Sequence, residues 1–163
     1  MKGTFNEEDF LKDTEKYLTD IRVPDVTRKW VFYFLSEYKE IMPEDENIDL
    51  VFITDQINGE GRRLLINLWF FSENYMMEMK DFQLKGSDKM DMNKLSKQVI
   101  YMEITKNYPF NATDEPLLGD MGPRLHVYFK LNSDIGGELD ATGENCKYLS
   151  TIVKERVAKN FYG

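Results

Sequence analysis

The spacing of apolar residues changes once along this chain, near residue 47, and this change constrains the fold more than any other feature. Before it, apolar residues recur every three or four positions, as on one face of a helix. From residue 47 to about residue 140 they alternate with polar residues or form short blocks, as in strands. The segment from about 144 to 161 returns to the helical spacing. The predicted order is two helices, about six strands and one helix.

The N-terminal segment predicts a helical hairpin. Residues 6–21 and 25–41 are each amphipathic, with charges opposite an apolar stripe. Asn6 and Asp25 stand where a side chain can accept hydrogen bonds from the free amides of the first turn, so they are the predicted N-caps. We expect residues 1–44 to form this hairpin and to pack on the same domain as the rest of the chain.

The middle of the chain predicts an antiparallel, strongly twisted sheet, because short apolar runs are separated by turn residues. The predicted strands are residues 48–54, 64–71, 75–79, 99–105, 125–131 and 138–141. The connections at 82–95 and 107–123 are rich in Gly, Pro and Asp and are predicted as loops. Thr142 is the predicted cap of the last helix.

Charge excludes several kinds of partner. The chain holds 21 Lys and Arg against 29 Asp and Glu, a net charge of −8. Residues 1–44 carry 7 basic and 10 acidic residues, so both parts of the chain are acidic. An even acidic field repels phosphate backbones and anionic lipid. We therefore expect no nucleic-acid partner, and binding to a membrane surface is not favoured.

Length and composition predict one folded domain. With 163 residues and 42% hydrophobic residues, the chain can bury a core, and no run approaches the roughly 18 apolar residues of a transmembrane segment. The first residues lack the apolar run of a signal peptide, and the single cysteine, Cys146, cannot form an intramolecular disulfide. We expect a soluble, cytoplasmic protein.

The order and pattern of four segments carry a family resemblance. They are DQINGEGRR at 55–63 with the apolar run that follows it, the strand at 75–79, the polar lead-in and alternating strand at 95–104, and the segment from 125 to the end of the closing helix. Over about residues 47–161 these resemble bacterial pleckstrin-homology-like domains, including the GRAM type. The resemblance implies an α+β fold in which residues 45–163 form a partly open antiparallel barrel with a C-terminal capping helix, preceded by the helical hairpin.

The resemblance also implies a scaffold that binds rather than catalyses. In the lipid-binding branch of the family, the first hairpin loop carries spaced Lys and Arg residues. This chain offers only the adjacent pair Arg62 and Arg63, beside Asp55 and Glu60. Binding of an anionic lipid head through Arg62 and Arg63 is therefore a further alternative rather than the leading hypothesis.

No catalytic residue, metal site or cofactor is predicted. His126 is the only histidine, which excludes a His-pair metal site, and it is expected on the polar face of its strand. Cys146 is expected to be buried, since no base or oxyanion site accompanies it. Asp114, Glu115 and Asp120 could together hold a cation, but such clusters arise by chance in an acidic chain.

The aromatic residues suggest the function. Trp69 and Phe71 share one face of a predicted strand and Phe70 takes the other, so both faces need covering. The default expectation is core packing, in which the barrel interior covers one face and the hairpin, whose apolar stripe includes Trp30 and Phe34, covers the other. If the hairpin docks elsewhere, these three residues form with Trp30 and Phe34 the predicted interaction surface. The leading hypothesis is a non-catalytic module for protein binding and self-association, giving a homo-oligomer. The alternative is a small-ligand-binding protein or enzyme with a pocket between barrel and helices, in which Asp or Glu, Tyr and His126 supply the polar groups. An apolar cavity of about 300 Å³ or more with convergent polar groups would favour it.

Overall fold

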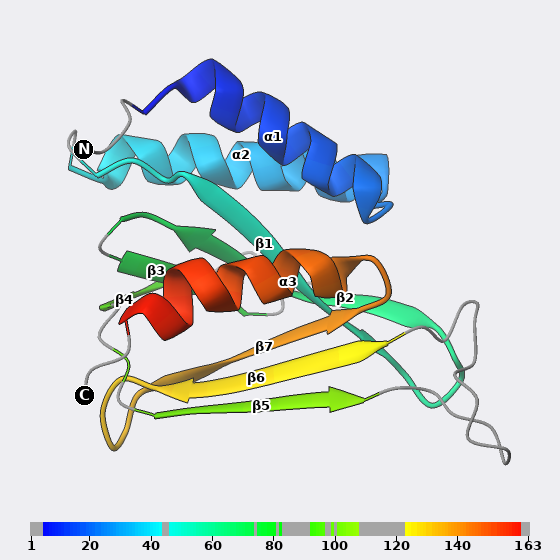
Figure 1. Cartoon of the computed structure of the whole chain (residues 1–163). Coiled ribbons are helices and arrows are strands. Elements are labelled where there is room, and N and C mark those ends of the chain that lie inside the picture. Colours follow the sequence, from blue (N-terminus) through cyan, green and yellow to red (C-terminus); the bar gives the residue numbers. More distant parts are fainter. Residues whose placement is uncertain are drawn as a thin grey trace, which may run out of the picture. The chain divides into compact units, whose positions relative to one another are not determined.

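The computed structural model describes residues 5–43, 46–73, 75–80, 82, 92–96, 99, 101–107 and 123–160, and the fold is α+β (Figure 1). The helices are α1 (Glu7–Asp20), α2 (Asp25–Ile41) and α3 (Asn145–Ile152), and α3 continues into the π-helical turn η1 (Val153–Val157) and the 3-10 turn η2 (Ala158–Asn160). The strands are β1 (Leu50–Ile57), β2 (Arg63–Phe71), β3 (Tyr75–Met79), β4 (Met92–Ser96), β5 (Tyr101–Asn107), β6 (Arg124–Lys130) and β7 (Gly136–Thr142). None of the described helices combines the length and hydrophobicity needed to cross a lipid bilayer.

The chain divides into two compact units. Unit 1 comprises Met1–Phe52 and Leu68–Leu95, and unit 2 comprises Ile53–Asn67 and Ser96–Gly163. Unit 1 therefore holds α1, α2, β3, the start of β1 (50–52), the end of β2 (68–71) and β4 up to Leu95. Unit 2 holds the rest of β1 and β2 with the turn between them, together with β5, β6, β7 and α3.

The strands form two hydrogen-bonded sheets, with orders β1-β2-β3-β4 and β5-β6-β7. The pairs β2–β3, β5–β6 and β6–β7 are antiparallel, and a helix follows the last strand, as predicted. In the described part of the chain no strand pairing joins the two sheets, so a pleckstrin-homology-like barrel stays a prediction. β4 lies within the segment that the sequence predicts as a loop. It is short and mostly polar, and it lacks the alternation that marks a half-buried strand.

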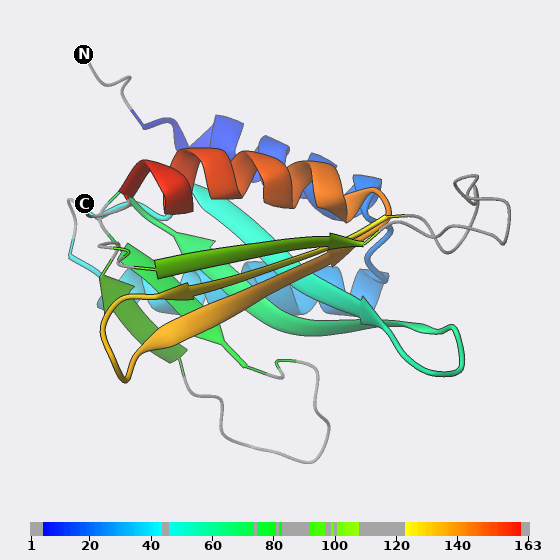
Figure 2. The same cartoon turned by 60° about the horizontal axis from the view of Figure 1, so that its bottom comes forward.

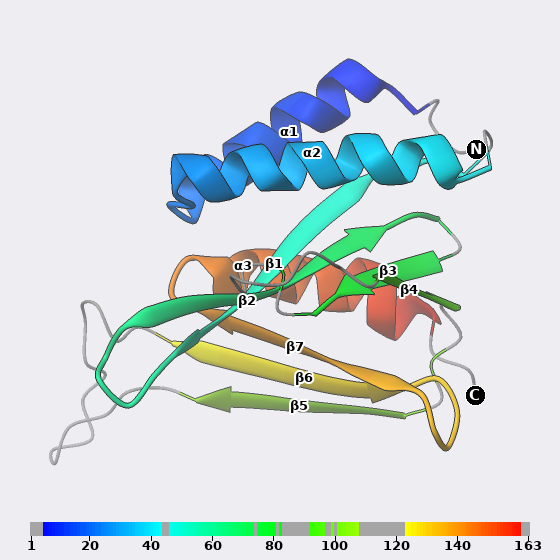
Figure 3. The ribbon, with the colours of Figure 1, turned by 180° about the vertical axis from the view of Figure 1, so that it is seen from behind.

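In unit 1, α1 and α2 run antiparallel, side by side (Figure 3). The predicted cap of α1 is confirmed, because the amide of Asp9 donates to Asn6 Oδ1 over 3.1 Å. The predicted N-cap of α2, Asp25, is wrong: Pro24 occupies the N-cap position, and Asp25 is the first residue of the helix. Proline suits the start of a helix because it has no backbone N–H, and an N–H at this position would find no carbonyl acceptor within the helix.

The core of unit 1 is aromatic. The ring of Tyr17 on α1 stacks on Phe52 with centroids 6.2 Å apart, and Tyr38 on α2 meets Phe70 edge-on at 6.5 Å. The helices therefore pack on the strands of their own unit. The β2–β3 pairing sets Phe71 opposite Met76 and Phe70 opposite Met77, and all four side chains are buried.

Unit 2 is built on the three-stranded sheet, with α3 packed against β6 and β7 (Figure 2). Leu125, Val127 and Phe129 are buried and alternate with partly exposed residues, as predicted for this strand. Gly136 opens β7 where a Cβ atom would lie only 2.4 Å from the carbonyl oxygen of Phe129, so this register requires glycine.

A buried carboxylate joins β1 and β2 to β7 and α3 within unit 2. Asp55 is 0% exposed. Its Oδ1 accepts hydrogen bonds from the Thr142 amide (3.0 Å) and Asn145 Nδ2 (2.8 Å). Its Oδ2 accepts from Thr142 Oγ1 (2.5 Å) and Arg63 Nε (2.7 Å). We call these four residues the Asp55 clasp. Thr142 thus belongs to β7 and the clasp, and its predicted role as the cap of α3 is wrong; Glu144 stands at that position.

Removal of the buried carboxylate should strongly destabilise unit 2. In Asp55→Ala, the guanidinium of Arg63 and the donors of Thr142 and Asn145 lose a common partner, so we expect the free energy of unfolding to fall by about 3–5 kcal/mol. Asp134→Asn, which removes one exposed carboxylate of the same unit, should change it by about 0.5 kcal/mol at most. Urea unfolding followed by circular dichroism measures both values. A loss below about 1 kcal/mol for Asp55→Ala would mean that the clasp contributes little.

Candidate functional site

The outer face of α2 carries four large apolar side chains that are exposed. They are Val26 (66% exposed), Trp30 (51%), Tyr33 (52%) and Ile41 (71%). Spacings of four, three and eight residues keep them on one side of the helix. The buried residues of α2 lie on a different arc: Thr27, Val31, Phe34 and Leu35. The helix therefore has two apolar faces, of which one packs into unit 1 and one meets solvent.

The aromatic part of this face is preorganised. The ring of Trp30 stacks on Phe34 with centroids 5.5 Å apart, and its edge meets Tyr33 at 5.7 Å. Phe34 is buried and anchors the two exposed rings to the core. Contacts between rings restrict rotamers, so less side-chain entropy is lost when a partner covers them.

The remaining residues of the predicted interaction surface are buried. Trp69, Phe70 and Phe71 are each 0% exposed and belong to the hydrophobic core. The hairpin helices help to cover this strand, since Tyr38 of α2 contacts Phe70 within unit 1. Of the five predicted surface residues, Trp30 alone is exposed.

The two predicted lipid-binding arginines have different environments. Arg63 donates to Asp55, so its charge is balanced inside the clasp. Arg62 is exposed at the β1–β2 turn, where its amide donates to Asn58 Oδ1 over 2.9 Å. The two side chains therefore do not form a joint basic site in this structure.

His126 has a carboxylate partner that the sequence could not reveal. Its Nδ1 lies 2.5 Å from Asp140 Oδ1, across the β6–β7 pair. The second oxygen of Asp140 accepts a hydrogen bond from Gln56 Nε2 at 3.0 Å. His126, Glu138 and Asp140 each place one possible metal-ligand atom within 4.8 Å of the others. His126 lies on the partly exposed face of its strand, as predicted.

Unit 1 contains a cavity of about 340 Å³ between α1, α2 and residues 46–48. Most of its lining side chains are apolar: Phe5, Phe10, Leu11, Phe32, Leu35, Met42 and Ile48. The charged lining residues are Glu7, Lys39 and Glu46, of which Glu7 and Lys39 form an ion pair. The size and composition fit a small apolar ligand with one polar group.

Cys146 is buried, as predicted, and its thiol is held in a polar contact with backbone. Its Sγ lies 3.2 Å from the carbonyl oxygen of Pro123 and 3.4 Å from that of Ala141, so the two oxygens share its single S–H donor. Burial, reinforced by the negative charge of Asp55, raises the pKa of Cys146 to about 11. The thiolate that nucleophilic chemistry requires is therefore scarce at neutral pH.

Cys146 should react slowly with thiol reagents. At pH 8, a pKa near 11 leaves about 100-fold less thiolate than the ordinary value of 9.0, before burial slows access further. We expect the rate of iodoacetamide labelling to rise about tenfold per pH unit up to about pH 11. Ser133→Cys, in an exposed turn, should add one fast-reacting thiol as a control. Equal rates for the two thiols at pH 8 would contradict the buried assignment.

Searches of protein-family models, curated proteins and solved structures found no match to this chain. The predicted cation candidates Asp114, Glu115 and Asp120 lie outside the described residues.

Sequence reasoning missed two features for different reasons. The pairing of His126 with Asp140 depends on the β6–β7 register, which periodicity does not give. The split of the apolar stripe of α2 into two faces could have been noticed, because apolar residues there span a wider arc than one packed face needs.

Proposed function

We propose that this protein is a non-catalytic module that self-associates through the outer face of α2. The observation that supports this is the exposure of Val26, Trp30, Tyr33 and Ile41 on one side of a single helix. Tyr and Trp are the residues that most often dominate binding energy at interfaces. A pleckstrin-homology-like scaffold, suggested by the sequence resemblance, is compatible with a binding role.

The face is complementary to a second copy of itself in an antiparallel arrangement. Val26 and Ile41 lie near the two ends of α2, and Tyr33 lies close to its midpoint. In an antiparallel pair, Val26 meets the partner's Ile41, and the two Tyr33 rings meet near the two-fold axis. A symmetric pair of this kind uses the same patch on both subunits, which is the commonest way in which soluble proteins form dimers.

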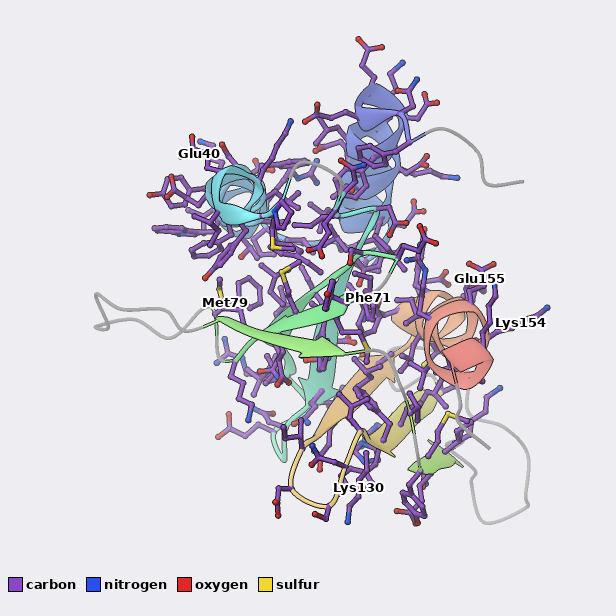
Figure 4. All side chains as sticks on the ribbon, turned by 90° about the vertical axis from the view of Figure 1, so that its left-hand side faces the viewer. Glu40, Phe71, Met79, Lys130, Lys154 and Glu155 are labelled. Carbon is purple, nitrogen blue, oxygen red and sulfur yellow. The ribbon has the colours of Figure 1, made fainter. Side chains whose placement is uncertain are left out.

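Charges beside the apolar face favour the same arrangement. Lys29 and Glu40 are both exposed and lie about three helical turns apart, on the same flank of the face. Figure 4 shows Glu40 on the outer side of α2. A two-fold axis perpendicular to the helices brings each Lys29 toward the partner's Glu40. In a parallel pair these residues would lie on opposite sides of the interface and could not meet.

The size of the face sets the expected affinity. The 17 residues of α2 span about 26 Å, so a contact limited to this helix falls below the roughly 800 Å² per partner of a standard interface. We expect a dissociation constant on the order of 10–100 μM.

Exchange of the two charges tests the antiparallel pair. Lys29→Glu alone and Glu40→Lys alone place like charges together, so each should weaken the dimer by about 5-fold. The double variant has the same net charge as the original chain and restores opposite charges, so it should recover most of the affinity. Sedimentation velocity over a concentration series measures all four constants.

Trp30→Glu serves as the control that removes the interface, because it puts a charge at the centre of the apolar face. A wild-type mass equal to the monomer at about 1 mM would contradict self-association. Equal effects of the single and double charge variants would contradict the antiparallel arrangement.

The cavity of unit 1 favours a second candidate function, the binding of a small apolar ligand. Leu11 lines the cavity and is 38% exposed, so Leu11→Trp should partly fill the space without unfolding α1. We expect this variant to bind the neutral fluorescent probe N-phenyl-1-naphthylamine about 10-fold more weakly. Leu64→Trp, at a comparably exposed position on β2, is the matched control. Equal probe binding by both variants would exclude the cavity as the binding site.

A further inference from the structure

Three metal-ligating side chains meet on one face of the β5-β6-β7 sheet. His126 on β6 stands directly opposite Asp140 on β7, and Glu138 precedes Asp140 by two residues. Because side chains alternate along a strand, Glu138 and Asp140 point to the same face as His126. Their ligand atoms all lie within 4.8 Å of one another. All three residues belong to unit 2, so their proximity does not depend on the placement of unit 1.

Asp140 is held in place by two polar partners. One oxygen meets His126 Nδ1 at 2.5 Å, and the other accepts from Gln56 Nε2 at 3.0 Å. The Asp140 side chain is only 18% exposed, whereas that of His126 is 38% exposed. Gln56 follows Asp55 on β1, so the Asp55 clasp fixes the strand that presents this amide. Outer partners of this kind orient metal ligands and tune their affinity.

We propose that His126, Glu138 and Asp140 form a binding site for a divalent transition-metal ion of the Zn²⁺ type. One imidazole and two carboxylates are the donor set that Zn²⁺, Co²⁺ and Ni²⁺ accept, whereas Ca²⁺ and Mg²⁺ prefer oxygen donors throughout. The two carboxylates balance the charge of the ion. Three protein ligands leave room for water, because the site is open to solvent on the side of Glu138, which is exposed.

Binding requires a small adjustment of the side chains. Ligand atoms around a tetrahedral ion with bonds of about 2.1 Å are roughly 3.4 Å apart, so the His126–Asp140 pair, at 2.5 Å, must open by about 0.9 Å. The hydrogen bond between them is lost, and the ring proton must lie on Nε2 so that Nδ1 is free to bind the ion. Glu138 must move in from solvent to complete the set. A site formed on these terms would be accessible and reversible.

The single histidine allows a direct test on the unmodified, untagged chain. Titration with ZnCl₂, followed in proton–nitrogen NMR spectra of the imidazole, should shift the one set of ring signals until one equivalent has bound. CaCl₂ at the same concentrations should leave them unchanged. Ring signals that do not respond to Zn²⁺, or that respond equally to Ca²⁺, would overturn the proposal.

Calorimetry of variants then tests the ligand set. We expect His126→Ala and Asp140→Ala to weaken Zn²⁺ binding at least 10-fold, and Gln56→Ala, which removes only an outer partner, to weaken it by about 10-fold. Asp134→Asn removes one exposed carboxylate elsewhere in unit 2 and should leave the affinity unchanged. Affinities that fall equally in all four variants would mean that the ion binds the acidic surface in general, which would overturn the site.

Discussion

The buried carboxylate of Asp55 is the interaction on which the organisation of unit 2 depends. A charge without exposure to water is tolerated only when donors surround it, and Asp55 has four: two from Thr142 and one each from Asn145 and Arg63. These donors come from β2, β7 and the first residue of α3, while Asp55 itself lies on β1. One side chain thus joins segments nearly 90 residues apart in the sequence.

The clasp also explains the limits of the sequence predictions. Local signals gave α1, α2 and β3 almost to the residue, because their apolar spacing and the Asn6 cap are local properties. For two residues, Thr142 and Asp55, contacts with distant parts of the chain determine a role that differs from the one the local sequence indicates. Thr142 has the composition of a helix cap, but a buried acceptor far away in sequence takes its hydroxyl. Asp55 looks like a turn residue until β7 and α3 surround it.

The candidate sites show the same difference between local signals, which the sequence carries, and long-range contacts, which it does not. The sequence predicts Trp30 as an interaction residue because it lies on the apolar stripe of the hairpin, and Trp30 is exposed. The triplet of Trp69, Phe70 and Phe71 has equal aromatic content but is buried, since pattern alone does not show whether another element covers a strand. The contact of His126 with Asp140, and of Asp140 with Gln56, cannot be predicted from the sequence. A one-residue shift between β6 and β7 would set His126 opposite Leu139 or Ala141 and would abolish it.

The proposed antiparallel pairing of α2 can be tested most directly by cross-linking, because Cys146 is buried and supplies an unreactive background. We expect Tyr33→Cys, near the two-fold axis, to give a covalent dimer with a short bismaleimide. Val26→Cys should give one only when mixed with Ile41→Cys. Self-linking of Val26→Cys alone as efficient as that of Tyr33→Cys would indicate a parallel pair, and failure of every variant to link would contradict pairing through this face.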